Sequence, residues 1–302
     1  MTLPNTPEDI VSKLRMFRSR YPRHSLVLVE GPTDRALWTE YKVDRCALIP
    51  AGNKEKAVEA LKLANSLKAL NGVAAIIDPD YWLVEQSDQL NVGNLQFDNS
   101  PDMELMLLTT PALEKVLRNT FVYIATDEIH RFANSLRAEA LRLAGEFGYF
   151  RLLDFRHREY NLMLRRVADN FPTFIDEQTL RFDDDTVVTT LLGESQAVTS
   201  TELLSEVETL KLEISLSAKL CRGNDAISLL AFLLPAHFKA VFKRDISQKA
   251  RNQTTGNELK RALRLAFEFA HFSLTQLYSR IRAWEAANQP FRIIRTDLVM
   301  EH

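Results

Sequence analysis

The stretch SLVLVEGPTDRALW, residues 25–38, decides the fold, because a run of apolar residues ends in a single carboxylate and then breaks at a glycine and a proline. An apolar run without alternation is typical of a strand buried on both faces, as in a parallel sheet. The residues that follow have the spacing of a helix. The stretch therefore predicts a strand, a turn and a helix, with Glu30 at the tip of the strand.

Similar apolar runs recur along the first third of the chain. RCALIP (45–50) leads into a helical pattern, GVAAIID (72–78) leads into a loop, and NLQF (94–97) is a further short strand. An opening helix precedes them all and begins with the start signal at residues 6–9. Strands that alternate with helices indicate βαβ units and a parallel sheet.

The pattern changes near residue 125. Apolar residues then recur at spacings of three and four, as in helices that pack on one another, over residues 126–147, 199–220, 225–243 and 257–287. We therefore expect an α/β fold with two domains. Residues 1–125 would form a parallel sheet with flanking helices, and residues 126–302 a mostly α-helical domain.

Net charge, cysteine content and hydropathy indicate the compartment of the protein and the kinds of partner that it can bind. The 302 residues carry a formal net charge of −2, so a basic field over the whole chain is absent and any polyanion must meet a local patch. The two cysteines, Cys46 and Cys221, form no CxxC motif, which favours a reducing compartment. No apolar run has the length of a membrane span, and the first residues lack the pattern of a signal peptide. We expect a soluble cytoplasmic protein without membrane contact.

Five acids stand where the strands end. Glu30 closes the first strand, Asp78 and Asp80 follow the third, and Asp102 and Glu104 come just after the fourth. Functional groups of an open parallel sheet collect at the carboxyl ends of its strands. Carboxylates this close repel one another unless a cation lies among them or some stay protonated. Oxygen ligands suit Mg²⁺, or Mn²⁺, so the five acids are candidate metal ligands.

Each acid also has a structural alternative. Glu30 could simply start a turn, and Asp78 could cap a helix. Asp102 could be an ordinary acid in the first turn of a helix, where the helix dipole favours negative charge.

Lys54 follows the second strand at the same edge, where an ammonium group would neutralise charge developing on a phosphate. The alternative for Lys54 is a solvated lysine in the first turn of a helix, and Arg35 is a weaker candidate for the same reason.

Two acidic signatures carry a family resemblance. The Glu30-Gly31 turn with Thr33-Asp34, and the later IIDPD (76–80), resemble the signatures of the Toprim fold over about residues 24–125. Further segments are similar to the AriB family of Toprim nucleases, subunits of PARIS anti-phage defence systems: LVEGPTDRALW, IPAGNKEKAVEAL, PDMELMLL, RGNDAISLL and SRIRAWEAANQPFRII. Pro101 departs from this branch, which carries a histidine at that place.

The resemblance implies an activity and partners, and the residue types at the strand ends suggest the roles of the site residues. It implies a metal-dependent endonuclease that is held inactive by an ABC-type ATPase subunit. The nuclease would be released when a phage counter-defence protein is sensed, and the released form could be a homodimer. Host tRNA is the favoured substrate. Asp78 and Asp80, with Glu30, would bind one metal ion, and Asp102 or Glu104 a second. Glu30 is alternatively the general base, and Lys54 the second catalytic residue.

In the second half of the chain, basic and acidic residues are concentrated in different stretches. Arginines dominate residues 151–166, eight basic residues face two acids over 239–264, and ten acids face two basic residues over 176–213. Basic helices of this kind are candidates for phosphate contacts, and the acidic stretch for a partner-facing surface. The alternative is that both are solvated faces.

Three other functions stay open at this point. The chain could be a regulatory or binding subunit that uses the Toprim fold without catalysis, a DNA-cleaving Toprim nuclease, or a metal phosphohydrolase of small phosphates. A GxxxxGK[ST] loop is absent from the sequence, so ATP hydrolysis would need another protein.

Overall fold

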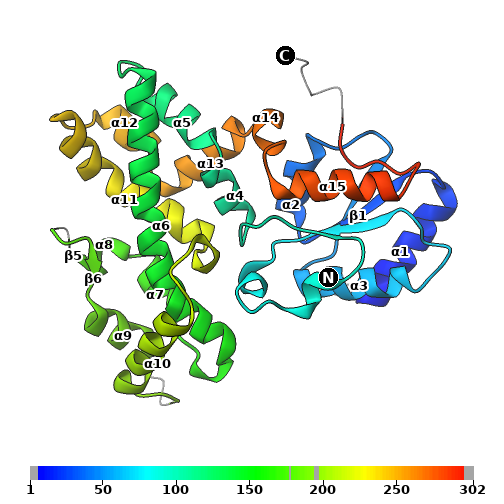
Figure 1. Ribbon diagram of the computed structural model, residues 1–302, viewed down its shortest axis with the longest axis horizontal. Helices are drawn as coiled ribbons and strands as arrows, with labels where there is room; N and C mark the ends of the chain where they lie inside the picture. Colours follow the sequence, from blue (N-terminus) through cyan, green and yellow to red (C-terminus); the bar gives the residue numbers. More distant parts are fainter. Residues whose placement is uncertain (1–5, 177, 194–196, 296–302) are drawn as a thin grey trace. The chain divides into compact units, whose positions relative to one another are not determined.

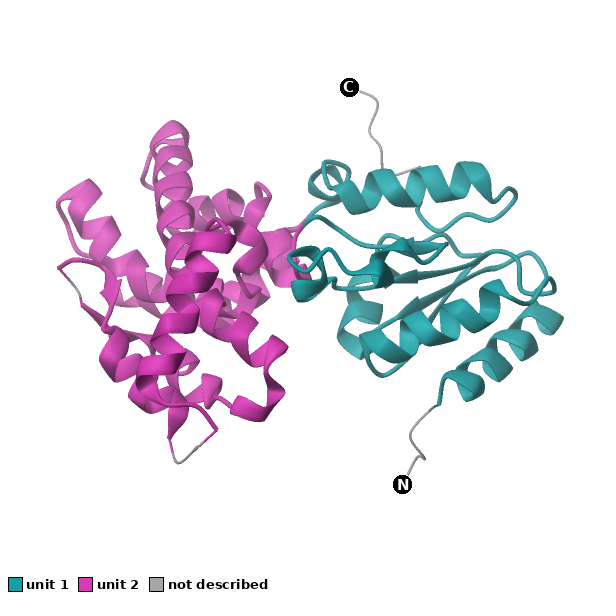
Figure 2. Ribbon diagram, turned by 60° about the horizontal axis from the view of Figure 1, so that its bottom comes forward, with its two compact units in different colours: residues 1–99, 268–302 teal, residues 100–267 magenta. Residues whose placement is uncertain are grey.

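The computed structural model describes residues 6–176, 178–193 and 197–295, which form two compact units (Figure 2). Unit 1 comprises residues 1–99 and 268–302, and unit 2 comprises residues 100–267. This division differs from the expected border at residue 125. Helices α4 (Met103–Thr109) and α5 (Ala112–Thr120) pack on α11 (Gly223–Phe242) and α6 (Thr126–Arg156) of unit 2, and the last part of the chain returns to unit 1.

A parallel sheet of four strands organises unit 1, as the sequence predicts. Its strands are β1 (Ser25–Val29), β2 (Cys46–Pro50), β3 (Val73–Ile76) and β4 (Leu95–Gln96), in the order β2-β1-β3-β4. All three neighbouring pairs are parallel. Every residue of β1 is buried, which accounts for its continuous apolar run. The α/β class and the parallel sheet are confirmed.

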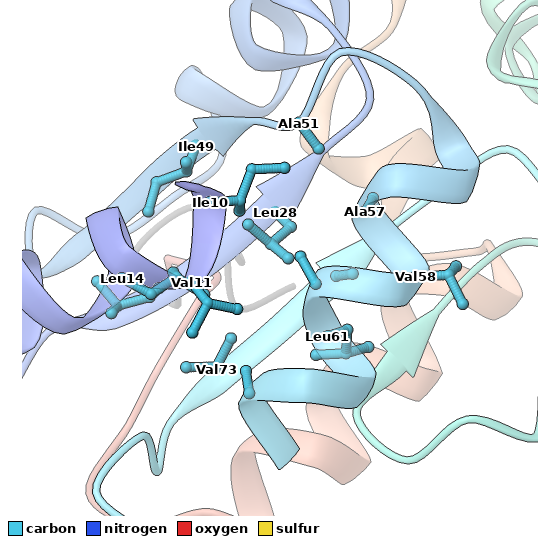
Figure 3. Packing of buried hydrophobic residues seen from close by; sticks show 14 of the residues in the cluster. Ile10, Val11, Leu14, Leu28, Ile49, Ala51, Ala57, Val58, Leu61 and Val73 are labelled. Atoms are coloured by element: carbon cyan, nitrogen blue, oxygen red, sulfur yellow. The ribbon is translucent and has the colours of Figure 1, made fainter. Parts of the chain in front are cut away.

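Helices cover both faces of this sheet (Figure 1). On one face lie α1 (Pro7–Arg20) and α3 (Lys54–Asn65), whose apolar residues form a common core with the strands (Figure 3). Leu14 of α1, Leu28 of β1 and Leu61 of α3 are fully buried in it, and each contributes about 1.5–3 kcal/mol. On the other face lie α2 (Pro32–Thr39) and α15 (Gln276–Ala287).

The segment after α15 returns to the edge of the sheet. Val43 N donates to Ile293 O over 2.9 Å, and residues 42 and 294 form an antiparallel bridge. Glu285 of α15 is buried and accepts hydrogen bonds from the backbone N–H groups of Ile293 and Ile294 over 2.7 and 2.8 Å. Short helix α14 (Phe269–Phe272) contributes Phe272, which packs against Trp38 of α2. These contacts assign residues 268–295 to unit 1.

Unit 2 is helical, as the sequence predicts. The long helices α6 and α11 pack on each other, and α13 (Gly256–Ala266) packs on both α5 and α11. A two-stranded antiparallel sheet adds β5 (Ile175–Asp176) and β6 (Arg181–Phe182). The remaining helices are α7 (Leu164–Ala168), α8 (Phe171–Phe174), α9 (Asp184–Leu192), α10 (Ser200–Glu213) and α12 (Gln248–Gln253).

Helix α11 is the most apolar long helix. Among the helices that the structure describes, it alone has the length and composition of a membrane span. Its packing gives another explanation, because α11 contacts α4, α6, α8 and α13 and buries Asp225 in an ion pair with Arg151. A helix with these neighbours is the core helix of unit 2.

Candidate active site

The carboxyl ends of β1 and β3 bring two of the predicted residues together. Glu30 directly follows β1, and Asp78 follows β3, which pairs with β1 in parallel. The carboxylate Oε1 of Glu30 accepts a hydrogen bond from the backbone N–H of Asp78 over 2.8 Å. Glu30 is therefore fixed against the start of the IIDPD loop.

Lys54 lies at the same edge and is buried. It is the first residue of α3, directly after the loop that leaves β2, and its side chain is only 7% exposed. Its Nζ lies 2.5 Å from Oδ2 of Asp80, 3.4 Å from the carbonyl oxygen of Pro79 and 4.5 Å from the centre of the Trp82 ring. The alternative of a solvated lysine is wrong, because the ammonium group is enclosed and paired.

Asp80 occupies an unusual backbone conformation. Its φ is 46°, in the left-handed region, which aspartate and asparagine adopt more readily than other residues except glycine. Asp80 begins a short 3₁₀ turn over Asp80–Leu83, and its side chain is 46% exposed. Residues held in such conformations cluster at functional sites. The turn presents the Asp80 carboxylate to Lys54 on one side and to solvent on the other.

The environment of Glu30 changes its acidity. Burial is the main cause that raises the pKa of Glu30 to about 7, from an ordinary value of 4.5. The hydrogen bond from Asp78 and the charge of Lys54 lower this pKa, while the charges of Asp80 and Asp34 raise it. A carboxyl group with a pKa near 7 exchanges protons readily at neutral pH. Asp34 itself accepts from Gly31 N over 2.8 Å and so helps to cap α2.

The donor chemistry of this edge suits a divalent cation. Glu30, Asp78 and Asp80 offer carboxylate oxygens, the ligands that Mg²⁺ and Mn²⁺ prefer, and a bound cation would favour the ionised form of Glu30, whose pKa is raised by burial. Over the described ranges, no three acidic, histidine or cysteine side chains are already grouped as a metal-binding set. The Asp80 carboxylate forms an ion pair with the Lys54 ammonium group, so Asp80 could bind a metal ion only by sharing or giving up this pair.

Asp102 belongs to unit 2 and has a structural role there. It is the N-cap of α4, where its Oδ1 accepts from Leu105 N over 2.8 Å. Its Oδ2 accepts from Gly223 N, at the start of α11, over 2.7 Å. The carboxylate thus ties together the first turns of two helices. The sequence alternative also gave Asp102 a structural role at the helix start, but inside the first turn and not at the cap. Metal binding by Asp102 stays a prediction.

Glu104 also has partners within unit 2. Its Oε1 lies 2.6 Å from Arg264 Nη2 and 3.0 Å from Lys260 Nζ, and its side chain is 10% exposed. Burial alone would raise the pKa of Glu104, but the two cations outweigh it and hold this pKa below its usual value. Glu104 is therefore ionised and already neutralised. Its role as a metal ligand likewise stays a prediction.

The basic runs of unit 2 are partly used for packing. Arg151 and Asp225 form a buried ion pair with two hydrogen bonds, so Arg151 is not available to a phosphate. Lys239 pairs with Asp245 over 3.2 Å. Exposed basic side chains remain on or near α11, α12 and α13: Lys243, Arg244, Lys249, Arg251 and Arg261. Arg35, on α2 of unit 1, is exposed as well.

The acidic stretch 176–213 does not form one element. It spans the turn between β5 and β6, α9 and α10, and several of its acids close local hydrogen bonds. Asp183 caps α9, Glu202 completes the capping box of α10, and Glu206 accepts from the Tyr160 hydroxyl over 2.8 Å. These acids have structural uses, and a partner-facing role stays a prediction.

No protein-family model and no curated protein matches this chain.

Proposed function

We propose that this chain is a Toprim-type phosphodiesterase that depends on Mg²⁺ or Mn²⁺ and cleaves nucleic acid in the cytoplasm. One observation carries the proposal. A carboxyl group with a pKa near 7, a buried ammonium group and two aspartates share the carboxyl edge of a parallel sheet. This is where open α/β sheets bind ligands, and the combination supplies both proton transfer and positive charge.

The residues divide the work as follows. A divalent ion held by Asp78 and Asp80, with Glu30, would polarise a phosphodiester and activate water. Glu30 is alternatively the general base, which would accept a proton at Oε2 because its Oε1 is held by the backbone N–H of Asp78. Lys54 places an ammonium group beside the same loop, and it would stabilise negative charge on a phosphate by exchanging its partner Asp80 for the substrate. Lys54 is 6% exposed, so most of its side chain is shielded from solvent.

The biological setting rests on sequence similarity. The segments that resemble the AriB family favour an effector of anti-phage defence, with host tRNA as substrate and an ABC-type ATPase as its restraining partner. The absence of a GxxxxGK[ST] loop from the sequence is compatible with a separate ATPase. Co-expression with a neighbouring ATPase would yield a stable complex with suppressed cleavage, and gel filtration without association would contradict this part.

A cleavage panel tests the activity. Purified protein is incubated with Mg²⁺ or Mn²⁺ and plasmid, linear DNA, total RNA or tRNA, next to a Glu30→Ala variant and a chelator control. We expect cleavage that needs the metal and Glu30, with tRNA cut fastest. Preferential cutting of DNA would favour the DNA-cleaving alternative, and hydrolysis of small phosphate esters alone would favour a phosphohydrolase.

One observation favours a second candidate, a binding module without catalysis. The Asp80 carboxylate is already neutralised by Lys54, so part of the acidic cluster is satisfied without a metal ion. Under this alternative, wild-type protein would cleave no member of the panel, and Mn²⁺ would not change its stability.

A further inference from the structure

A pocket in unit 2 lies between α8, α11 and the start of α13. It has a volume of about 480 Å³, and we call it the α11 pocket; its lining includes Asp169, Pro172, Ser228, Phe232, Asn257 and Lys260. The volume falls within the range of about 300–1,000 Å³ that is typical of small-ligand sites. All residues that line the pocket belong to unit 2, so this site is complete within one compact unit.

Part of the lining is apolar and flat. Phe171 and Pro172 come from α8, and Phe232 comes from α11. The Phe171 ring is buried and packs edge-on against Phe147 of α6, with the ring centres 5.2 Å apart. Phe232 is half-buried, so part of its side chain is open to a ligand. Aromatic rings offer faces on which a planar group can stack.

The polar side chains of the pocket have unused hydrogen-bonding capacity. The Ser228 hydroxyl and the Asn257 amide are exposed, and over the described ranges neither side chain makes a hydrogen bond. Asn224, which also lines the pocket, accepts from Lys260 Nζ over 2.7 Å at its Oδ1, so its NH₂ group stays available. An amide presents a donor beside an acceptor, the pattern that matches the edge of a nucleobase.

The charges of the pocket disfavour an anion inside it. Lys260 is the one basic residue among the lining residues, all of which the structure describes, and its Nζ is already paired with Glu104, 3.0 Å away. Asp169 is exposed and adds a carboxylate. A phosphate would meet this acid, whereas the amino group of a base can donate a hydrogen bond to it. The pocket therefore suits a neutral planar group with polar edges.

Two arginines lie next to the pocket. Arg165 precedes Asp169 by one helical turn, and Asp169 N donates to the carbonyl oxygen of Arg165 over 2.9 Å. Arg165 and Arg166 are exposed, and neither forms an ion pair with any residue that the structure describes. Their guanidinium groups are open to phosphates outside the pocket.

We propose that the α11 pocket receives one unpaired nucleobase, while Arg165 and Arg166 contact the phosphates of the same strand. This inference rests on the proposed function only in taking nucleic acid as the ligand. Pairing and stacking cover the bases of a duplex, so a base of a single-stranded segment is the one that can enter. A free nucleotide carries the same base and is the second possible source.

The test is fluorescence anisotropy of labelled short RNA strands with the full-length protein and a chelator. One strand carries its bases, and the other has the same phosphates on abasic sugars. We expect the wild type to prefer the strand with bases by about fivefold or more, because stacking of one base on an aromatic side chain is worth at least that factor. Phe232→Ala should remove most of this preference, and Asn257→Ala should lower it about threefold.

Two sets of variants separate the base from the phosphates. Val241→Ala on α11 and Asn252→Ala on α12 change exposed side chains outside the pocket and are the matched controls, which should keep the full preference. Arg165→Glu and Arg166→Glu should weaken binding of both strands alike. Each lost phosphate contact should also flatten the logarithmic salt dependence by about 0.7.

Competition with free mononucleotides separates the two sources of the base. A mononucleotide that binds as tightly as the strand, and less tightly to Phe232→Ala, would assign the pocket to free nucleotides. Weaker binding of the mononucleotide would assign it to a strand.

The proposal would be overturned if the wild type bound neither strand or bound both with equal affinity. It would also be overturned if Asn257→Ala, which changes an exposed side chain, and a folded Phe232→Ala both kept the full preference. The measurement requires no cleavage, so these outcomes refute the base site alone, and a failure to cleave refutes only the proposed activity.

Discussion

Replacing Glu30 by glutamine should stabilise unit 1 at neutral and alkaline pH in the absence of metal. Glutamine keeps an oxygen that can accept the hydrogen bond from Asp78 N, and it removes a carboxylate that burial disfavours. Substitution of a buried, hydrogen-bonded side chain usually destabilises a protein. The expected gain in stability therefore follows only from the electrostatic account of Glu30.

The size of the effect follows from the shift in pKa. The pKa of Glu30 is raised from 4.5 to about 7 in the folded chain. Below pH 4.5 the group is protonated in both states and has no effect. Between pH 4.5 and 7 the folded state binds the extra proton, so the wild type loses stability as the pH rises. At 1.36 kcal/mol per unit, the loss above pH 7 reaches about 3 kcal/mol, an upper figure because water partly screens the group.

Tryptophan fluorescence offers a selective assay. All three tryptophans, Trp38, Trp82 and Trp284, belong to unit 1, so their emission in a urea titration reports the unfolding of that unit. With a urea slope of about 1–3 kcal/mol/M, the midpoint of Glu30→Gln should exceed that of the wild type by roughly 1–3 M at pH 8. The two midpoints should converge as the pH falls toward 4.5.

A substitution at an exposed glutamate serves as the control. Glu8→Gln changes an exposed glutamate of α1, and its midpoint should stay close to that of the wild type at every pH of the same range. A difference between Glu30→Gln and wild type that does not vary with pH, or a Glu30→Gln variant less stable than wild type at pH 8, would refute the electrostatic account.

Three further substitutions probe the contacts of other candidate residues. In Gly223→Ala the new Cβ would lie 2.3 Å from Oδ1 of Asp102, so we expect a loss of about 1–3 kcal/mol, measured by circular dichroism in urea. Glu104→Gln breaks a buried ion pair and should lower the free energy of unfolding by about 3–5 kcal/mol, while the affinity for Mn²⁺ stays unchanged. Unchanged stability together with a loss of Mn²⁺ affinity would make Glu104 a metal ligand instead. Lys54→Met should slow single-turnover cleavage about 100-fold or more, and wild-type rates would exclude Lys54 from catalysis.

The sequence predicted the parts of the fold that depend on local pattern. Continuous apolar runs located β1, β2 and β3, because a strand buried on both faces needs apolar side chains throughout, and the short NLQF segment located the two-residue strand β4. The parallel arrangement then implied that Glu30 and Asp78 share an edge, which their hydrogen bond confirms. The strand ends were predictable because side chains at these positions leave the core together.

Contacts between distant residues could not be predicted in this way. Glu104 and Arg264 are 160 residues apart, and neither the period nor the charge of the intervening helices identifies the pair. The return of residues 268–295 to unit 1 depends on Glu285, which looks like an ordinary helix glutamate in the sequence. The burial of Lys54 was missed for the same reason, since it needs the loop after β3 folded over it. Such positions are set by tertiary packing.

Titration of the protein with Mn²⁺ at pH 8, followed by electron paramagnetic resonance of the free ion, tests the central claim most directly. If the carboxyl edge of the sheet holds a divalent ion, wild-type protein and the surface control Arg15→Glu should bind Mn²⁺ with equal affinity. Asp78→Asn and Glu30→Gln should each bind it at least tenfold more weakly, because each loses a charged oxygen ligand. Equal Mn²⁺ affinity in all four proteins, or no binding by the wild type, would contradict the account.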